Sequence, residues 1–289
     1  MYWINTIIQG ALIGGLYALF ATGLSLMFGV MRIINLAHGD FIVLSAYLAV
    51  VVTSTLDIDP FLALLFVVPL MFALGYVLQR GLLNFTLGGD ILRPLLVTFG
   101  LSIVVQNLLL EVFSADSRRL QAPWLETASL RVGEHLAIGV MPAIVFVVAV
   151  ATIVALEALL YWTDLGRAFR ATSDDSDTAR LYGVNNRAIY AMATAIALAA
   201  VSIAGVMVGI RTIFDPTIGP ARLLYAFEVV IIGGLGSLWG TLAGGIILGV
   251  AQALGGAIDP SWDTLAGHVV FLIVLLVRPG GLFPRTFDQ

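Results

Sequence analysis

Residues 163–187 read TDLGRAFRATSDDSDTARLYGVNNR, a polar segment that separates two long apolar runs. Its charged residues are Asp164, Arg167, Arg170, Asp174, Asp175, Asp177, Arg180 and Arg187. The run before it, from Leu136 to Leu156, and the run after it, from Ile189 to Ile210, contain no charged residue. Each run has the roughly 20 residues that a helix needs to cross a bilayer. The segment is therefore a loop in water that joins two membrane spans.

Part of this loop is predicted to form a short helix from Asp174 to Tyr182. Ser173 or Asp174 would be its N-cap, and acidic residues in the first turn suit the helix dipole. Arg180 lies late in the helix, and Gly183 is suited to the C′ position. The less polar side of the helix consists of Thr178, Leu181 and Tyr182. A helix with one such side is suited to a groove on a partner protein.

The composition is that of an integral membrane protein. Hydrophobic residues make up 60% of the chain and charged residues 11%, with a mean hydropathy of +1.02, whereas globular domains are about 25% charged. Nearly all of the 289 residues are needed for spans and short connections. The prediction is therefore one membrane domain over residues 1–289, with no separate soluble domain.

Two residue types are absent, and their absence limits the chemistry. Without cysteine the chain has no disulfide, thiolate metal site or cysteine nucleophile, and without lysine it lacks the phosphate-binding GxxxxGK[ST] loop. No HExxH or GxSxG motif occurs either. We expect no enzymatic activity, no cofactor, no metal and no nucleic-acid partner.

The predicted fold is all-α, a polytopic integral membrane helical bundle with about eight or nine transmembrane or half-membrane segments and a short cytoplasmic coupling helix. The predicted spans are Ile4–Val30, Phe41–Leu56, Phe61–Gln79, Pro94–Phe113, Leu136–Leu156, Ile189–Ile210 and Leu265–Val277. The uncharged stretch Val229–Ile258 is too long for one crossing and is divided into two segments near Ser237. Residues Ser114–His135 are expected to form an ordered surface loop.

The arginines indicate how the chain is oriented. If the spans alternate and the 163–187 loop is cytoplasmic, the inner side holds Arg32, Arg80, Arg93, Arg167, Arg170, Arg180, Arg187, Arg278 and Arg285. The outer side then holds Arg118, Arg119, Arg131, Arg211 and Arg222. The positive-inside rule favours this sense. It places the N-terminus outside and the C-terminus in the cytoplasm.

A polar cluster follows the first span, where Asn35, His38, Gly39 and Asp40 lie in a connection too short for an ordinary loop. Polar groups at membrane depth mark a pathway or a binding site. The alternative is structural: Asn35 or Asp40 caps the second helix and His38 satisfies backbone groups of the turn. Both interpretations stay open. By contrast, Glu111, Glu157, Glu228 and His268 are expected near span ends, where their side chains reach the interface.

Four stretches resemble one known family. They are Gly10–Leu19 (GALIGGLYAL), Ile34–Phe41 (INLAHGDF), Gly166–Ala171 (GRAFRA) with Ala179 and Gly183–Asn185 (GVN), and Arg278–Phe283 (RPGGLF). Together they are similar to the permease subunits of branched-chain amino acid ABC importers, over essentially the whole chain.

The resemblance implies the partners and the coupling site. Such an importer contains two ATP-binding-cassette ATPase subunits, a second permease subunit, identical or related, and a periplasmic or extracytoplasmic solute-binding protein, in the bacterial inner membrane. The segment that contacts the ATPase in this family matches the loop around Gly183. The predicted coupling residues are Arg170, Ala171, Asp174, Asp175, Ala179, Leu181, Tyr182 and Gly183. Related permeases also carry urea, amides and aromatic acids, so the resemblance leaves the substrate open.

A different class of transporter is the alternative. An ion-coupled secondary transporter or facilitator would move small solutes without an ATPase. Such proteins carry charged residues deep inside their bundles, and the long uncharged runs of this chain supply none. The permease of an ABC importer is therefore the first hypothesis, and the ion-coupled transporter is the second.

Overall fold

The computed structural model describes residues 2–87, 92–122, 125, 128–132 and 136–283. In chain order the helices are α1 (Tyr2–Met31), α2 (His38–Leu56), α3 (Pro60–Gly81), η1 (Leu83–Phe85), α4 (Leu92–Phe113), α6 (Val140–Trp162), α7 (Asp164–Asp174), α8 (Ser176–Leu181), α9 (Asn186–Arg211), α10 (Gly219–Gly233), α11 (Leu238–Ile258), η2 (Pro260–Trp262) and α12 (Asp263–Val277). Two strands, β1 (Ser129–Val132) and β2 (Leu136–Gly139), precede α6.

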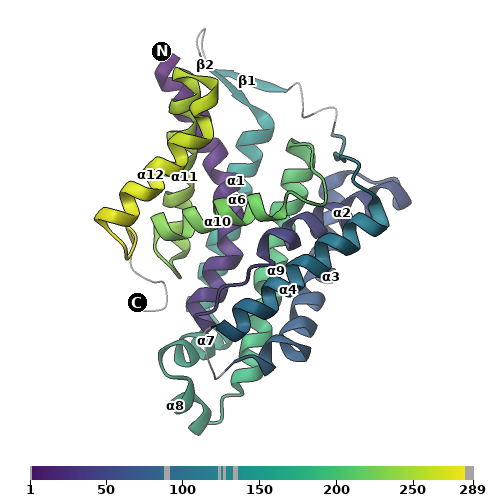
Figure 1. Cartoon of the computed structure of the whole chain (residues 1–289), viewed down its shortest axis with the longest axis vertical. Helices are drawn as coiled ribbons and strands as arrows, with labels where there is room; N and C mark the ends of the chain where they lie inside the picture. The colour runs from purple at the N-terminus through teal and green to yellow at the C-terminus, as the bar shows by residue number, and fades with distance from the viewer. Residues whose placement is uncertain (1, 88–91, 123–124, 126–127, 133–135, 284–289) are drawn as a thin grey trace.

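The fold is the predicted helical membrane bundle. Within the described residues, eight helices are long and apolar enough to cross a membrane. The N-terminus and the β1–β2 hairpin lie at one end of the molecule, and α7 and α8 lie at the other (Figure 1). We call these ends the hairpin side and the α7–α8 side. The short helix α10 lies across the bundle and packs on α1, α2 and α11.

Small residues bring the central helices together. Gly10 and Gly14 of α1 face Gly245 and Gly249 of α11, and a Cβ at any of the four would collide with the facing backbone. Close approach of this kind is how helices associate without a hydrophobic driving force between them. The GxxxG spacings of these two helices therefore serve helix packing, as the sequence predicts.

The hairpin corrects the prediction for the fifth span. Residues Leu136–Gly139 form β2, paired antiparallel with β1 so that Ser129 is opposite Gly139, and the helix begins only at Val140. The apolar composition of residues 136–139 suits a strand as well as a span. Pro142 lacks a backbone N–H and is tolerated only in the first turn of a helix, which is where α6 places it. The 114–135 loop thus ends in a strand that the apolar pattern did not separate from the helix.

The two segments predicted around Ser237 are confirmed, with a different start for the first. Helix α10 begins at Gly219 rather than near Val229. The prediction began too late because Arg222 and Glu228 interrupt the uncharged run on which it was based. Positive φ angles at Gly234 (111°) and Gly236 (83°) turn the chain, and the Ser237 hydroxyl caps α11 by accepting from Gly240 N at 3.1 Å.

The end of the described chain closes on this turn. The amides of Leu282 and Phe283 donate to the carbonyl oxygens of Ile232 (3.0 Å) and Gly233 (2.9 Å), the last two residues of α10. Terminal carbonyls of a helix have no partner within the helix. The RPGGLF motif therefore completes the C-terminal end of α10.

Candidate functional site

The connection between α1 and α2 returns into the bundle instead of turning at the surface. The imidazole of His38, the first residue of α2, bonds through Nε2 to the carbonyl oxygen of Phe20 at 2.7 Å. Phe20 precedes the end of α1 at Met31 by roughly 16 Å of helix, at 1.5 Å per residue. Residues 32–37 therefore run back along α1, and α2 begins near the middle of the membrane. The turn predicted at membrane depth is thus an extended return segment.

Neighbouring side chains satisfy the backbone donors of this return segment. The amide of Leu36 donates to Thr98 Oγ1 of α4 at 3.1 Å, and the amide of Ala37 donates to Asn35 Oδ1 at 3.0 Å. The N-cap of α2 is Ala37, so neither Asn35 nor Asp40 is the cap residue that the structural interpretation expected. Because lipid offers no hydrogen-bond partners, irregular backbone at this depth depends on such side chains.

Asn35 and His38 are both buried within this arrangement. The Asn35 amide nitrogen lies 4.0 Å from Met27 Sδ. The His38 ring stands against Gly23 of α1, where a Cβ would come within 3.0 Å of His38 Cε1. Nδ1 of His38 has no hydrogen-bond partner among the described residues. The two side chains thus contact protein on all sides rather than solvent.

Asp40 lies where the first turns of α2 and α10 meet. Its carboxylate accepts hydrogen bonds from Ser102 Oγ (2.5 Å) and Gln106 Nε2 (2.9 Å) of α4. A Cβ at Gly219, the first residue of α10, would collide with this carboxylate, and a Cβ at Gly39 would collide with the Gly219 backbone. Each helix presents the positive end of its dipole here. Asp40 is therefore a buried carboxyl group between two helix N-termini.

The polar residues of α4 that bond to the return segment and to Asp40 are those that sequence reasoning missed. Thr98, Ser102 and Gln106 are spaced by four, so they share one face of α4 and meet the return segment and Asp40 in turn. A polar stripe of this spacing inside an apolar span was a signal available in the sequence. It would have placed α4 beside the 35–40 cluster.

The second candidate site is the pair of polar helices at the α7–α8 side (Figure 1). The sequence predicted one helix from Asp174 to Tyr182, and the structure has two. Asp174 ends α7, and α8 begins at Ser176 with Asp175 as its N-cap. The correction follows from Asp175 Oδ1, which accepts from the amides of Asp177 (3.0 Å) and Thr178 (3.1 Å) and so starts a new helix.

Electrostatics and turn geometry fix the shape of this segment. The Thr178 hydroxyl, followed by the Thr178 and Asp177 amides, holds the pKa of Asp175 below its usual value because these bonds favour the carboxylate. Gly183 has a φ of 88°, as its predicted C′ position requires. The chain reverses there and enters α9.

Several bonds fasten α7 and α8 to the membrane helices. Arg170 donates to the carbonyl oxygen of Leu160 at the end of α6 and lies over the Tyr161 ring, 5.2 Å from its centroid. Ser173 donates to Gly29 O of α1 at 2.6 Å. Asn186 donates to Ser176 O at 2.6 Å and joins α8 to α9. The segment is therefore joined by side-chain bonds to α1, α6 and α9.

The predicted coupling residues separate into two groups by exposure. Ala179 is buried and Arg170 is partly buried, so both hold the segment in place. Ala171, Asp174, Asp175 and Gly183 are exposed. Leu181 and Tyr182 are 87% and 86% exposed, which is unusual for an aliphatic and an aromatic side chain beside each other. These two form the apolar part of the exposed surface.

The Glu228 side chain does not reach the interface, contrary to expectation. It is buried and bonds to Nδ1 of His268, which is partly exposed, so α10 and α12 are joined by a polar pair. Gln252 of α11 is likewise buried, and its Oε1 accepts from the Tyr17 hydroxyl of α1 at 2.5 Å. The bundle interior is thus more polar than the uncharged runs indicated.

A bundle of membrane-spanning helices with paired polar groups inside and a structured polar segment at one end defines a polytopic integral membrane protein. Residues 6–278 match the family described as "Branched-chain amino acid transport system / permease component". The chain belongs to this family, which confirms the resemblance, and it is a permease component of a transport system. This favours the first transport hypothesis over the ion-coupled alternative.

Individual relatives span nearly the whole chain. It is 30% identical over 298 residues to the high-affinity branched-chain amino acid transport system permease protein BraD of Pseudomonas aeruginosa, covering 98% of this chain and 96% of that protein. It is 29% identical over 299 residues to the high-affinity branched-chain amino acid transport system permease protein LivH of Escherichia coli K12, covering 99% of this chain and 96% of that protein. Permease protein LivM of the same strain is 24% identical over 298 residues, covering 95% and 69%.

Proposed function

We propose that this chain is the membrane-spanning subunit of a binding-protein-dependent ABC importer and forms the pathway for branched-chain amino acids or a related small polar solute. The relatives' names support the substrate class. The proposal that a separate ATPase supplies the energy is supported by the exposed α7–α8 segment, which is bonded to three membrane helices. Transport against a gradient needs energy, and the chain lacks the lysine of a phosphate-binding loop.

The proposed complex contains two ATPase subunits, a solute-binding protein and a second permease. Escherichia coli K12 has two relatives of this chain, LivH and LivM, and both are named as permease proteins of a branched-chain amino acid transport system. We infer from this pair that the second permease is a related chain rather than an identical one. The proposed permease domain covers residues 1–289.

Coupling to the ATPase is proposed for the exposed residues of this segment. Leu181 and Tyr182 would enter a groove of the ATPase, with Asp174 and Asp175 at its edge and Gly183 setting the angle. Arg170 and Ala179 would hold the helices in register, and exposed Ala171 would lie on the surface that contacts the ATPase. Because α8 is fastened to α9 and α7 to α1 and α6, a displacement by the ATPase would tilt these helices together.

Uptake and ATP turnover in proteoliposomes test this function. The complete importer should take up leucine only with ATP and the binding protein. The paired change Leu181→Asp, Tyr182→Asp should lower uptake at least about tenfold, because one charge in an apolar groove already costs more than 1.4 kcal/mol. The ATPase should also be lost during purification or hydrolyse ATP without transport.

The matched control is Arg167→Ala. Arg167 is an exposed α7 residue whose ion pair is with its neighbour Asp164. This variant should transport like the unaltered protein. Full uptake and coupled ATP turnover in the Leu181, Tyr182 variant would exclude the segment from coupling.

We also propose that the α7–α8 side faces the cytoplasm of a bacterial cell and the hairpin side faces outside, in keeping with the positive-inside rule. The chain has no cysteine, so single ones report the topology. A cysteine at exposed Asp175 should resist an impermeant thiol reagent in intact cells, whereas one at exposed Ser129 of β1 should react. The reverse pattern would invert the orientation.

For the cluster of Asn35, His38, Gly39 and Asp40 we propose that it holds the return segment beside the pathway. Support comes from burial, since all four are shielded from solvent, and from the bonds that Asn35, His38 and Asp40 make to α1, α4 and the return segment itself. A substitution there should lower the yield of folded protein. Loss of transport in a fully stable variant would point to the pathway role instead.

A further inference from the structure

Two partly buried arginines interact with Tyr17 of α1. Arg211 ends α9, and Arg222 lies near the start of α10 with its guanidinium carbon 5.8 Å from the centroid of the Phe20 ring. Tyr17 lies near the middle of α1, roughly 20 Å of helix from either end. The sequence counted both arginines on the outer side, and the structure places them in helices rather than in the connection between them.

The charges of these arginines are not balanced within the described part of the chain. Arg211 Nη1 and Arg222 Nε are buried without a hydrogen-bond partner, and neither side chain forms an ion pair with a described acidic residue. Asp215 interacts with Arg222 only at longer range, and its Oδ1 already accepts from the amide (2.8 Å) and hydroxyl (2.6 Å) of Thr217. Two unpaired, mutually repelling cations that are partly buried are costly and mark a functional site.

The groups around Tyr17 offer donors to a ligand. Tyr17 stacks on Tyr225 at 5.0 Å between ring centroids, and its hydroxyl donates to Gln252 Oε1. Gln252 Nε2 is a third buried donor without a partner, beside Arg211 Nη1 and Arg222 Nε. These donors come from α9, α10 and α11 and converge on one residue of α1. A carboxylate accepts several such bonds at once.

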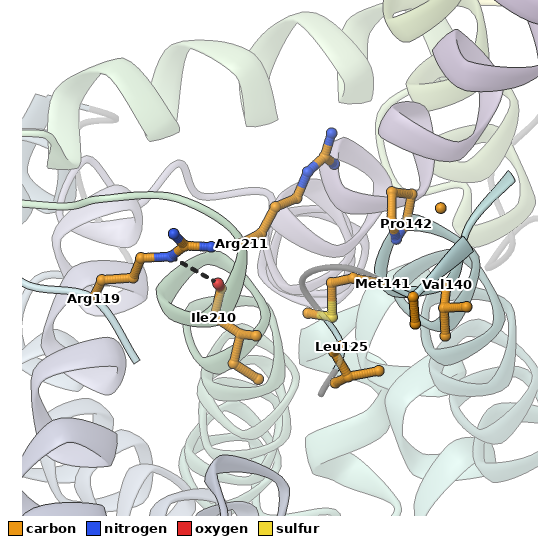
Figure 2. Close-up of a pocket in the computed structure, with 9 residues that line it drawn as sticks. Arg119, Leu125, Val140, Met141, Pro142, Ile210 and Arg211 are labelled. Atoms are coloured by element: carbon orange, nitrogen blue, oxygen red, sulfur yellow. Dashed lines mark hydrogen bonds between the residues drawn. The ribbon is translucent and has the colours of Figure 1, made fainter. Parts of the chain in front are cut away.

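A pocket at the hairpin side is bordered by Arg211. It has a volume of about 180 Å³ and is lined by Arg119, Leu125, Ala128, Gly139, Val140, Met141, Pro142, Ile210 and Arg211. In Figure 2 the Arg211 side chain extends away from the apolar residues, and Arg119 lies on the other side of the Ile210 carbonyl, to which it donates at 3.3 Å. Arg211 is therefore reached from the hairpin side, next to exposed Arg119.

We propose that Arg211 and Arg222 bind the carboxylate of the transported solute, with Gln252 as an additional donor and Arg119 at the entrance. This inference rests on the proposed function. Glu228, farther along α10, is not part of this site because it bonds to His268.

Uptake of leucine by the complete reconstituted importer tests the assignment. Arg211→Gln and Arg222→Gln should each lower uptake about tenfold or more, since a hydrogen bond to a charged group is typically stronger than the 1.4 kcal/mol that a factor of ten requires. Complex assembly and ATP turnover without binding protein should be unchanged. Arg222→Lys should recover part of the uptake because it restores the charge. The matched control, Arg118→Gln, removes an exposed arginine from the same side and should have no effect.

Each other result has a definite meaning. If the unaltered importer takes up leucine and both glutamine variants match it, the carboxylate site is wrong while the proposed function stands. If the variants lose the second permease during purification, the anion belongs to that subunit and the assignment is overturned. If the unaltered importer shows no ATP-dependent uptake of leucine, the proposed function is wrong, and the assignment of the carboxylate site, which depends on it, is wrong as well.

Discussion

The start of α2 and the start of α8 each carry an aspartate, in different surroundings and with different partners. In each, an aspartate lies at the beginning of a helix, where backbone amides have no partner within the helix. Asp175 caps α8 in water and bonds to amides of its own turn. Asp40 is buried at mid-depth, bonds to two side chains of α4, and also faces the first turn of α10.

The difference shows that surroundings, more than residue type, set the energetic importance of a polar group. Around α8, water replaces any bond that is lost, so each group contributes little by itself. At the start of α2, neither lipid nor a neighbouring apolar side chain can replace a bond. Substitutions at the buried site should therefore affect the whole fold, and substitutions in α8 should have local effects.

The largest effect should come from Gly39→Val. Backbone atoms of Gly219 and Leu223 occupy the space that a Cβ would need, and backbone cannot yield as a side chain can. Overpacking usually costs about 1–3 kcal/mol, and this contact should lie at or above the upper end. Thermal denaturation followed by size exclusion in detergent should show little or no folded protein.

The control for this substitution is Gly100→Val in α4. No heavy atom lies within 4 Å of a Cβ at this exposed position. Its melting temperature should stay close to that of the unaltered protein. Equal stability of the two valine variants would mean that α2 and α10 do not meet as described.

An intermediate effect is expected for Asp40→Asn. Asparagine keeps the shape but loses the charge between two helix N-termini and turns an acceptor into a donor facing Ser102 or Gln106. The expected loss is about 1–3 kcal/mol, as for a buried group left unsatisfied. Thermal melting of Asp40→Asn, Ser102→Ala and the double variant forms a cycle that should be clearly non-additive. Additive losses would show that the two side chains are not bonded.

The smallest effect should follow Asp175→Ala, which removes the cap of α8. The rest of the protein should melt as before, while amide hydrogen exchange in α8 becomes faster. The folded-state pKa of Asp175 is lowered, so its contribution is complete above the unfolded pKa and declines as pH falls through the folded pKa. Asp175→Asn should retain part of the protection and lose this pH dependence. A global loss of stability in either variant would contradict the local role.

The spans could be predicted from sequence because lipid imposes a simple rule: about 20 residues without charge form a crossing helix. The rule failed where other forces decide. It assigned residues 136–139 to a helix, although they pair as a strand, and it started α10 too late because buried Arg222 and Glu228 broke the apolar pattern. Charges inside a bundle need partners on other helices, and those partners are a tertiary property.

The candidate sites were predictable to different degrees. The polar loop and the glycine at 183 were visible as local signals, and only the boundary between α7 and α8 was missed. Asn35, His38 and Asp40 could be singled out as polar groups at depth, but their bonds to Phe20 and Ser102 depend on how the return segment packs. Arg211 and Arg222 were counted on the outer side, but a sequence does not show that α10 begins before Arg222 and lies across the bundle.

The bonds from Leu282 and Phe283 to the end of α10 impose an order of events on synthesis. Ile232 and Gly233 leave the ribosome before α11 and α12 exist, and at roughly 5–20 residues per second their partners follow only several seconds later. During that interval the carbonyls of α10 have no permanent partner, and the turn at Gly234 is free to change. The end of α10 thus reaches its final form only after residues 282 and 283 have been made. Its completion is timed by the arrival of these two residues rather than by insertion of α12.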